Sequence, residues 1–390
     1  MSRLRLALLG LISLVFAAGC TGAPIASAWP GLAANAELAF VANNNRVVAV
    51  NLSDGKQRWS FPATPGNGDQ FFADPGVSAD VIVVGSEGPL SSHSGALFGL
   101  DPATGAQLWC LGFDEKAAAR LGCPLTPSAT KSIVFGLMPP VDNRILGGVT
   151  VKDGGAYFGM ANNNIYAVDA QTGAYRWEAT AKNPIWAAPL VTDDTVYVAS
   201  LDHSLYAFNR ADGALRWKQD LGASLAGTPA LADGRLYLGT FGNKILALDA
   251  ASGEQRWSAD ANNWVWASPT VHAGAVYVTD LSGNLLAVDA QTGRPLWTAK
   301  PGGILRGSPA IAGDAVIVGD KDGYVYARSL ATGAEVWKQP AAGDNRGQLL
   351  GTPLVLPEAD LILVAPFSGS NWLVAYTTAG ALKWAFAPAQ

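Results

Sequence analysis

Eight segments of this 390-residue sequence share the spacing Gly-x-x-x-Trp, and this repeat constrains the fold more than any other feature. The segments end at Trp59, Trp109, Trp177, Trp217, Trp257, Trp297, Trp337 and Trp384. The intervals between these tryptophans are 50, 68, 40, 40, 40, 40 and 47 residues. Self-similarity at such a period is typical of propellers and solenoids, in which each repeat is one structural unit.

Each unit has the pattern of a small antiparallel sheet. Residues 229–260 alternate apolar and polar side chains and are interrupted by Gly, Asp and Asn, which predicts four short strands, named A to D here. Eight such units predict an all-β fold, an eight-bladed β-propeller that forms a single domain over residues 29–390. The first unit contains its own strand A within residues 30–42 if Pro30 is aligned with Pro229. We therefore expect closure by packing of blade 8 on blade 1 rather than by a swapped strand.

The repeated residues are predicted to be structural. An acid stands eight residues before four of the repeat tryptophans, at Asp101, Asp169, Asp249 and Asp289. At the turn between strands C and D, such a carboxylate can accept backbone N–H groups. The tryptophan has a large face to bury between blades and an indole N–H that needs a partner.

The N-terminus has the features of an export signal. Arg3 and Arg5 precede an apolar run from Leu6 to Ala18, which predicts a signal peptide over residues 1–19. Ala17-Ala18-Gly19-Cys20 resembles the bacterial lipobox, which implies lipidation of Cys20 and a tether over residues 20–28. The alternative is an ordinary cleavage site. We expect an exported protein that is lipid-anchored on the extracytoplasmic side of a membrane.

The other two cysteines, Cys110 and Cys123, are expected to form a disulfide in an oxidising compartment. They lie in the longest connection, which is expected to protrude near the channel mouth, with a helical turn between Asp114 and Gly122. A stabilising link is the simpler interpretation, and a redox role is the alternative.

Charge and motif content exclude several functions. Removing residues 1–19 leaves 24 basic and 31 acidic residues, a net charge of −7, so nucleic acid is not an expected partner. The three histidines fall in three kinds of turn or loop, and the sequence contains no metal-binding or catalytic motif. We therefore predict no catalytic, metal-binding or cofactor-binding residues.

The unit Ala-x-Asp-x-x-Thr-Gly-x-x-x-Trp, which residues 167–177 and 287–297 fit fully, resembles the tryptophan-docking repeat of pyrroloquinoline-quinone (PQQ) type propellers. The resemblance covers roughly residues 30–388. One branch, the quinoprotein dehydrogenases, holds PQQ and calcium in the channel and carries a vicinal disulfide, which this shorter chain lacks. The other branch, the BamB lipoproteins, has no cofactor and acts as a scaffold in outer-membrane β-barrel assembly. Lipobox, length and blade count favour the second branch.

Comparison among the repeats indicates where function resides. Three positions before the Pro that begins strand A, the residue varies in size and polarity: Phe72, Leu146, Trp186, Ala226, Trp266, Arg306 and Leu350. We expect this column to line the mouth of the central channel, with Trp264 nearby. The alternative is that Trp186 and Trp266 only plug the funnel as extra core.

Loop length indicates the same region, because all long connections are D-to-A or B-to-C and should share one face. Binding residues gather on such loops. The sequence thus predicts a non-catalytic, monomeric scaffolding lipoprotein that binds an extracytoplasmic protein or polymer through Phe72, Trp186, Trp264, Trp266 and Arg306. The alternatives are a small PQQ-dependent dehydrogenase and a glycan-binding propeller.

Overall fold

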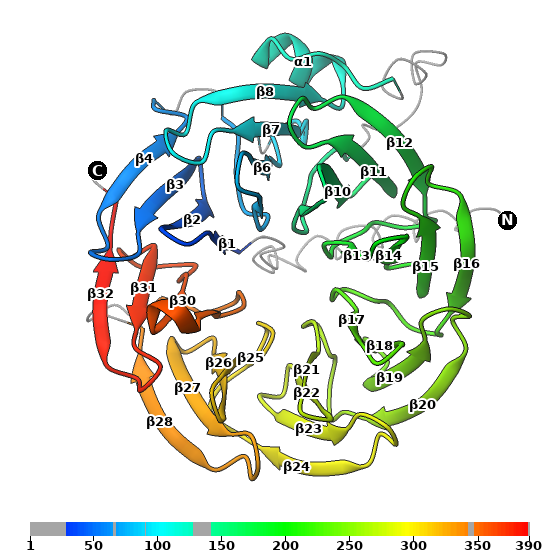
Figure 1. Ribbon diagram of the computed structural model, residues 1–390, viewed down its shortest axis with the longest axis vertical. Helices are drawn as coiled ribbons and strands as arrows, with labels where there is room; N and C mark the ends of the chain where they lie inside the picture. Colours follow the sequence, from blue (N-terminus) through cyan, green and yellow to red (C-terminus); the bar gives the residue numbers. More distant parts are fainter. Residues whose placement is uncertain (1–28, 65–67, 90, 128–141, 342–346, 389–390) are drawn as a thin grey trace, which may run out of the picture.

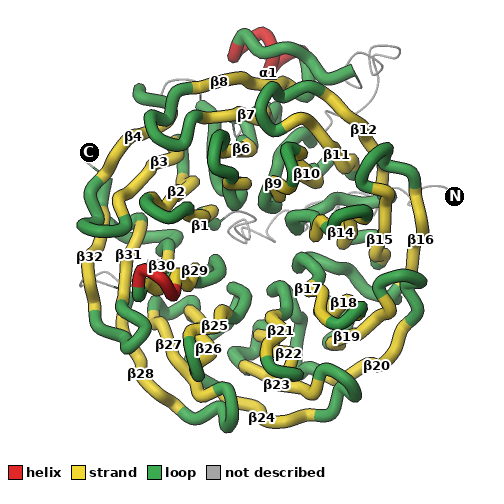
Figure 2. The backbone as a smooth tube through the Cα atoms, viewed as in Figure 1, coloured by secondary structure: helices red, strands yellow, loops and turns green. Residues whose placement is uncertain are grey.

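Each repeat folds into one four-stranded antiparallel sheet whose strands follow one another in the chain. A computed structural model describes residues 29–64, 68–89, 91–127, 142–341 and 347–388. Eight sheets surround a central axis like the blades of a propeller (Figure 1). In every blade the first strand lies near the axis and the fourth lies at the perimeter (Figure 2). The predicted all-β, eight-bladed fold is confirmed.

The first four blades contain strands β1 to β16. Blade 1 comprises β1 (Gly31–Ala34), β2 (Leu38–Asn43), β3 (Arg46–Asn51) and β4 (Gln57–Phe61). Blade 2 comprises β5 (Gly76–Val77), β6 (Ile82–Gly85), β7 (Ala96–Leu100) and β8 (Gln107–Gly112). Blade 3 comprises β9 (Thr150–Lys152), β10 (Gly155–Gly159), β11 (Asn164–Asp169) and β12 (Tyr175–Thr180). Blade 4 comprises β13 (Leu190–Val191), β14 (Thr195–Ala199), β15 (Ser204–Asn209) and β16 (Leu215–Asp220).

The last four blades contain strands β17 to β32. Blade 5 comprises β17 (Ala230–Ala232), β18 (Arg235–Gly239), β19 (Lys244–Asp249) and β20 (Gln255–Asp260). Blade 6 comprises β21 (Thr270–His272), β22 (Ala275–Thr279), β23 (Leu285–Asp289) and β24 (Pro295–Ala299). Blade 7 comprises β25 (Ala310–Ala312), β26 (Ala315–Gly319), β27 (Tyr324–Ser329) and β28 (Glu335–Pro340). Blade 8 comprises β29 (Leu354–Leu356), a 3₁₀ turn (Pro357–Ala359), β30 (Leu361–Val364), β31 (Leu373–Tyr376) and β32 (Leu382–Phe386).

The repeat tryptophans join neighbouring blades, as their chemistry predicts. The indole N–H of seven of them donates to a backbone carbonyl of the next blade at 2.8–3.3 Å. Each ring also lies against the repeat glycine of that blade, where an added Cβ would approach the ring to 2.6–2.8 Å. At every interface the ring of a repeat tryptophan therefore lies against a glycine position that has no room for a side chain, and seven of the eight indoles add a hydrogen bond.

The ring closes through the same contact. Trp384 of β32 donates to the carbonyl of Leu52 in blade 1 at 3.0 Å, and its ring packs on Gly55. Since all four strands of blade 1 come from one continuous segment, no strand is exchanged between the two ends. Closure by packing of blade 8 on blade 1 is therefore what the structure has.

One helix, α1 (Glu115–Leu121), interrupts the pattern between blades 2 and 3. The Asp114 carboxylate caps its first turn by accepting the N–H of Ala117 at 2.7 Å, and Gly122 ends it with a φ of +69°. The helical turn predicted between Asp114 and Gly122 is therefore present, and these two residues are its caps. Among the described residues there is no helix with the length and apolar character required to span a bilayer.

Candidate binding face and channel mouth

The D-to-A and B-to-C connections meet on one face, which we call the loop face. The residue four positions before the strand A proline donates its N–H to the B-to-C turn of the preceding blade. Examples are Val265 to Thr240 at 3.2 Å in a short connection and Leu349 to Asp320 at 3.0 Å in a long one. The long connections of blades 1 to 3 and 8 therefore lie on the same face as the short ones of blades 4 to 7.

Two columns on this face are fixed by packing. The side chains four positions before the strand A proline are all buried: Phe71, Ile145, Ile185, Leu225, Val265, Leu305 and Leu349. Two positions further on, only Ala or Gly occurs, and a Cβ added to Gly147 or Gly227 would lie 2.7 Å from the backbone of the next blade. The residue between these columns is therefore held at a fixed place near the axis.

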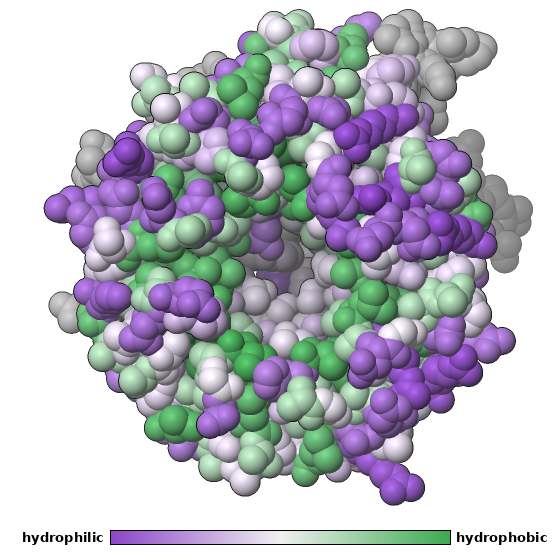
Figure 3. Space-filling model, viewed as in Figure 1, coloured by the Kyte–Doolittle hydropathy of each residue, from purple (hydrophilic) through white to green (hydrophobic). Residues whose placement is uncertain are grey.

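That intermediate residue lines the central hollow in every blade. The hollow is bordered by Phe72, Leu146, Trp186, Ala226, Trp266, Arg306 and Leu350, the predicted column, together with Trp29. Figure 3 views the opposite face, toward which the A-to-B and C-to-D turns project (Figure 2), and shows a hollow at the centre of that face too, with hydrophobic residues around it and hydrophilic ones toward the perimeter.

Trp29 is the member of this column that the sequence comparison missed. The ladder Ala33–Phe40–Ala49–Trp59 in blade 1 has the same register as Ala230–Tyr237–Ala247–Trp257 in blade 5. Trp29 therefore occupies the position of Ala226. Our alignment of Pro30 with Pro229 is wrong: the A-to-B turn of blade 1 has the same length as that of blade 5, so Leu32 is the equivalent of Pro229 and Pro30 lies two residues before it. The Asn35 side chain shapes that turn by accepting the N–H groups of Glu37 and Leu38.

The mouth is filled by stacked side chains from four different blades, namely blades 1, 4, 6 and 7. The Arg306 guanidinium lies over the rings of Trp29, at 4.5 Å, and Trp266, at 4.1 Å. Trp266 also stacks on Trp186 with ring centroids 5.5 Å apart. Burial lowers the pKa of Arg306 to about 10, and the arginine remains a cation that the ring faces attract.

The space at the mouth does not fit PQQ with calcium. The hollow holds about 80 Å³, whereas small-molecule sites usually measure ~300–1,000 Å³. Asp74 is the one carboxylate among the described residues that line it. Across the described ranges, no group of three or more His, Cys, Asp or Glu side chains is placed to hold a metal ion.

Outside the mouth, two large apolar side chains are exposed at equivalent positions of blades 6 and 7. Trp264 is 47% exposed and Ile304 is 41% exposed. Trp264 stacks on Phe241 with ring centroids 4.8 Å apart and an interplanar angle of 10°, and Phe241 in turn contacts Trp266 at 5.1 Å. An aromatic path thus runs from the rim of the loop face to the axis.

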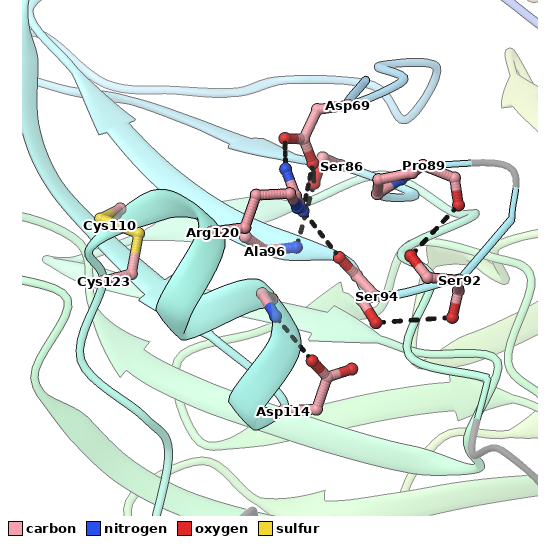
Figure 4. A network of polar contacts seen from close by, with 11 residues as sticks. Asp69, Ser86, Pro89, Ser92, Ser94, Ala96, Cys110, Asp114, Arg120 and Cys123 are labelled. Atoms are coloured by element: carbon pink, nitrogen blue, oxygen red, sulfur yellow. Dashed lines mark hydrogen bonds and ion pairs between the residues drawn. A yellow bond between two sulfur atoms is a disulfide. The ribbon is translucent and has the colours of Figure 1, made fainter. Parts of the chain in front are cut away.

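The part of the loop face formed by blades 1 to 3 is polar, and an ion pair and hydrogen bonds hold its loops together. Arg120 of α1 pairs with Asp69 and donates to the carbonyl of Ser94 at 3.1 Å (Figure 4). Asp69 also accepts from the Ser86 hydroxyl at 2.9 Å. These contacts join the helix to the connections that precede β5 and β7.

A buried carboxyl lies in the same region. Glu87 is 5% exposed, and burial raises its pKa to about 7 although Arg144 partly opposes this shift.

A second hollow of about 280 Å³ lies between blades 1 and 2. It is lined by Phe61, Phe71, Phe98 and Leu121 together with Asp69 and Gln107.

A disulfide joins Cys110 of β8 to Cys123, which follows α1. The chain after it runs parallel to the end of β8, where Gly112 pairs with Leu125. Our expectation that this loop protrudes near the mouth is wrong for its described first part, because α1 packs outside β8 at the perimeter (Figure 1). Its last residues, Ile145 to Gly148, do return toward the axis, where Leu146 lines the hollow. Cys20 and the predicted signal peptide lie outside the described residues.

Tryptophan-docked blades around a narrow mouth define a PQQ-type eight-bladed propeller. A family model described as outer membrane protein assembly factor BamB matches residues 21–138, 93–223 and 201–387. Since these matches span most of the sequence, the chain belongs to this BamB family. No curated protein matches the sequence.

Solved structures share the fold at low sequence identity. The crystal structure of BamB from Moraxella catarrhalis superposes with a TM-score of 0.66 at 20% identity, covering 88% of this chain and 92% of that one. The computationally designed Ika8 protein gives 0.67 at 12% identity, covering 92% and 97%. Quinohemoprotein alcohol dehydrogenase from Comamonas testosteroni gives 0.68 at 14% identity, covering 92% of this chain and 75% of that one. These likenesses concern the fold alone.

Proposed function

We propose that this protein is a non-catalytic, lipid-anchored scaffold that binds an extracytoplasmic polypeptide and assists the assembly of outer-membrane proteins. Membership of the assembly-factor family supports this proposal. The observation that carries it is the filled mouth, where Arg306 lies between Trp29 and Trp266. A channel that is closed by the chain's own side chains leaves the surface of the loop face for binding, rather than a cavity for a reaction.

The polar side of the loop face offers a firm docking surface. Arg120 fixes α1 to the connection that contains Asp69, so little chain entropy remains to be lost when a partner binds there. The adjacent hollow of about 280 Å³ has an aromatic floor of Phe61, Phe71 and Phe98. A hollow of this kind suits an apolar anchor side chain of a partner polypeptide.

Site-specific photo-crosslinking in native membranes tests this proposal. A photoreactive residue would replace Ser91 or Asn243, which are exposed on the loop face, or Asp233 or Gln291, which are exposed on the opposite face. We expect the two loop-face positions to crosslink to an extracytoplasmic protein, and the two control positions to give no such product. Crosslinks from the opposite face alone would refute the assignment of the binding face.

Cell fractionation tests the lipid anchor independently of the binding face. If the mature chain were found outside the membrane fraction, the lipid-anchor proposal would be refuted. The matched variant is Cys20→Ser, which is expected to remove the protein from the membrane fraction while leaving the propeller folded.

A further inference from the structure

Tryptophans that the repeat does not require are concentrated at one place. The sequence has 13 tryptophans, of which eight belong to the repeat. Of the other five, Trp29, Trp186 and Trp266 line the central hollow and Trp264 lies beside them on the loop face. Blade packing does not account for this concentration, because the repeat tryptophans already dock the blades.

Comparison with the equivalent blades shows that the Trp264–Phe241 pair is a local departure. Blades 4 to 7 have the same 40-residue spacing, so equivalent positions can be read directly from the sequence. The positions equivalent to Trp264 hold Pro184, Ser224 and Ile304, and those equivalent to Phe241 hold Leu201, Leu281 and Lys321. Both positions are aromatic at the junction of blades 5 and 6 and at no other junction among these four blades.

The Trp264–Phe241 pair has polar surroundings, in which amide side chains rather than charged groups are available to a ligand. Asn243 and Asn262 are exposed within two residues of Phe241 and Trp264, and the N–H of Ala261 donates to the carbonyl of Asn243 at 2.9 Å. The nearest opposite charges, Lys244 and Asp260, pair with each other. Amide side chains both donate and accept hydrogen bonds, as the hydroxyl groups of a neutral ligand require.

We propose that Trp264, supported from behind by Phe241, is a binding platform for a pyranose ring of a neutral glycan. One ring face of Trp264 is covered by Phe241, and the 47% exposure of the side chain leaves the other side open. The C–H bonds on one face of a pyranose carry partial positive charge and are attracted to the negative face of an indole. The exposed amides of Asn243 and Asn262, each two residues from a member of this pair, supply donors and acceptors for the hydroxyl groups of such a ring.

An apolar polypeptide segment is the competing occupant, and the chain provides a matched control for it. Ile304 is the exposed equivalent of Trp264 in the next blade, 40 residues on. A segment that is held by apolar area would use both side chains. A sugar that is held by stacking depends on a flat ring at position 264 and does not depend on Ile304.

The experiment follows the indole N–H signals of the purified, isotope-labelled protein by NMR during titration with cellotetraose, maltotetraose or the N-acetylglucosamine tetrasaccharide. The signal of Trp264 is identified by its loss in Trp264→Phe. We expect one of these sugars to shift that signal with an affinity of order 1 mM. Trp264→Leu should weaken binding by roughly two- to tenfold, the contribution of one stacking contact. Trp264→Phe, which keeps a ring, and Ile304→Ala should bind within about twofold of the unchanged protein.

Two results would overturn the platform. No shift of the Trp264 signal with any of the three sugars would do so. An equal loss of affinity in Trp264→Leu and Ile304→Ala would also do so, because it would assign the patch to apolar docking. Neither result bears on the scaffold proposal, which the crosslinking experiment tests independently.

Discussion

Replacing Gly55 by alanine tests whether tryptophan docking holds the propeller closed. Gly55 has a φ of +72°, and an added Cβ would lie 2.7 Å from the Trp384 ring. Left-handed backbone costs a non-glycine residue ~1–2 kcal/mol, and overpacking of a tight interface costs ~1–3 kcal/mol. We therefore expect Gly55→Ala to lower the free energy of unfolding by ~2–4 kcal/mol.

Two other glycines separate the backbone effect from the ring contact. Gly234 has a φ of +71°, but an added Cβ would meet nothing within 4 Å, so Gly234→Ala should cost only ~1 kcal/mol. Gly253 has a φ of +75°, and its added Cβ would lie 2.8 Å from Trp217. Because the two substitutions introduce the same left-handed backbone strain and the same clash with a repeat tryptophan, Gly253→Ala should match Gly55→Ala within ~1 kcal/mol if closure is as strong as an internal interface.

Urea unfolding, followed by circular dichroism, measures the three free energies, and hydrogen exchange locates the opening. In Gly55→Ala we expect the loss of protection to begin in blades 1 and 8. If Gly55→Ala were no less stable than Gly234→Ala, docking of Trp384 would not hold the ring closed. A much larger loss in Gly55→Ala than in Gly253→Ala would show instead that closure is weaker than the internal interfaces.

Three further perturbations test other parts of the structure. Replacing both Cys110 and Cys123 by serine should speed hydrogen exchange in α1 and the residues up to Thr126, while the blades stay protected, because the bond links that segment to one edge strand; general loss of protection would contradict this. For Glu87, burial raises the pKa from 4.5 to about 7, so the folded protein keeps a proton that the unfolded chain releases between these values. Stability due to this group is complete below pH 4.5 and falls as the pH rises to 7. Glu87→Gln should therefore be more stable than the unchanged protein at pH ~8 by up to ~3 kcal/mol, and equal to it at pH ~4, in thermal unfolding at both values. Arg306→Ala removes the cation between Trp29 and Trp266 and should accelerate hydrogen exchange at the start of β1 with a stability loss of ~1–2 kcal/mol; unchanged exchange there would show that Arg306 does not hold the N-terminal segment.

The repeat predicts the fold because each repeated residue has a local task. The Asp169 carboxylate accepts the N–H groups of Gln171 and Thr172, and the tryptophan reaches only to the next blade. The mouth was harder to predict. Its variable column is visible in the sequence, but the stacking of Arg306 depends on rings from other blades that only the closed fold brings together. Trp29 was missed because Pro30 was taken as the equivalent of Pro229, whereas Leu32 holds that position, and only the strand register corrects this two-residue shift.

The same geometry explains why the repeats of this chain differ from one another in two ways, by substitution and by insertion. In blades 4 to 7 the spacing stays at 40 residues and the changes are substitutions, such as Trp186, Trp266 and Arg306 in one column. That column lies between a buried residue and a position where a Cβ would meet the backbone of the next blade, so its side chain can change without moving the strands. An insertion in the connection before blade 3 has more room at the perimeter than at this crowded mouth. The described first part of that insertion lies outside β8, where the disulfide and Arg120 attach it to the ring.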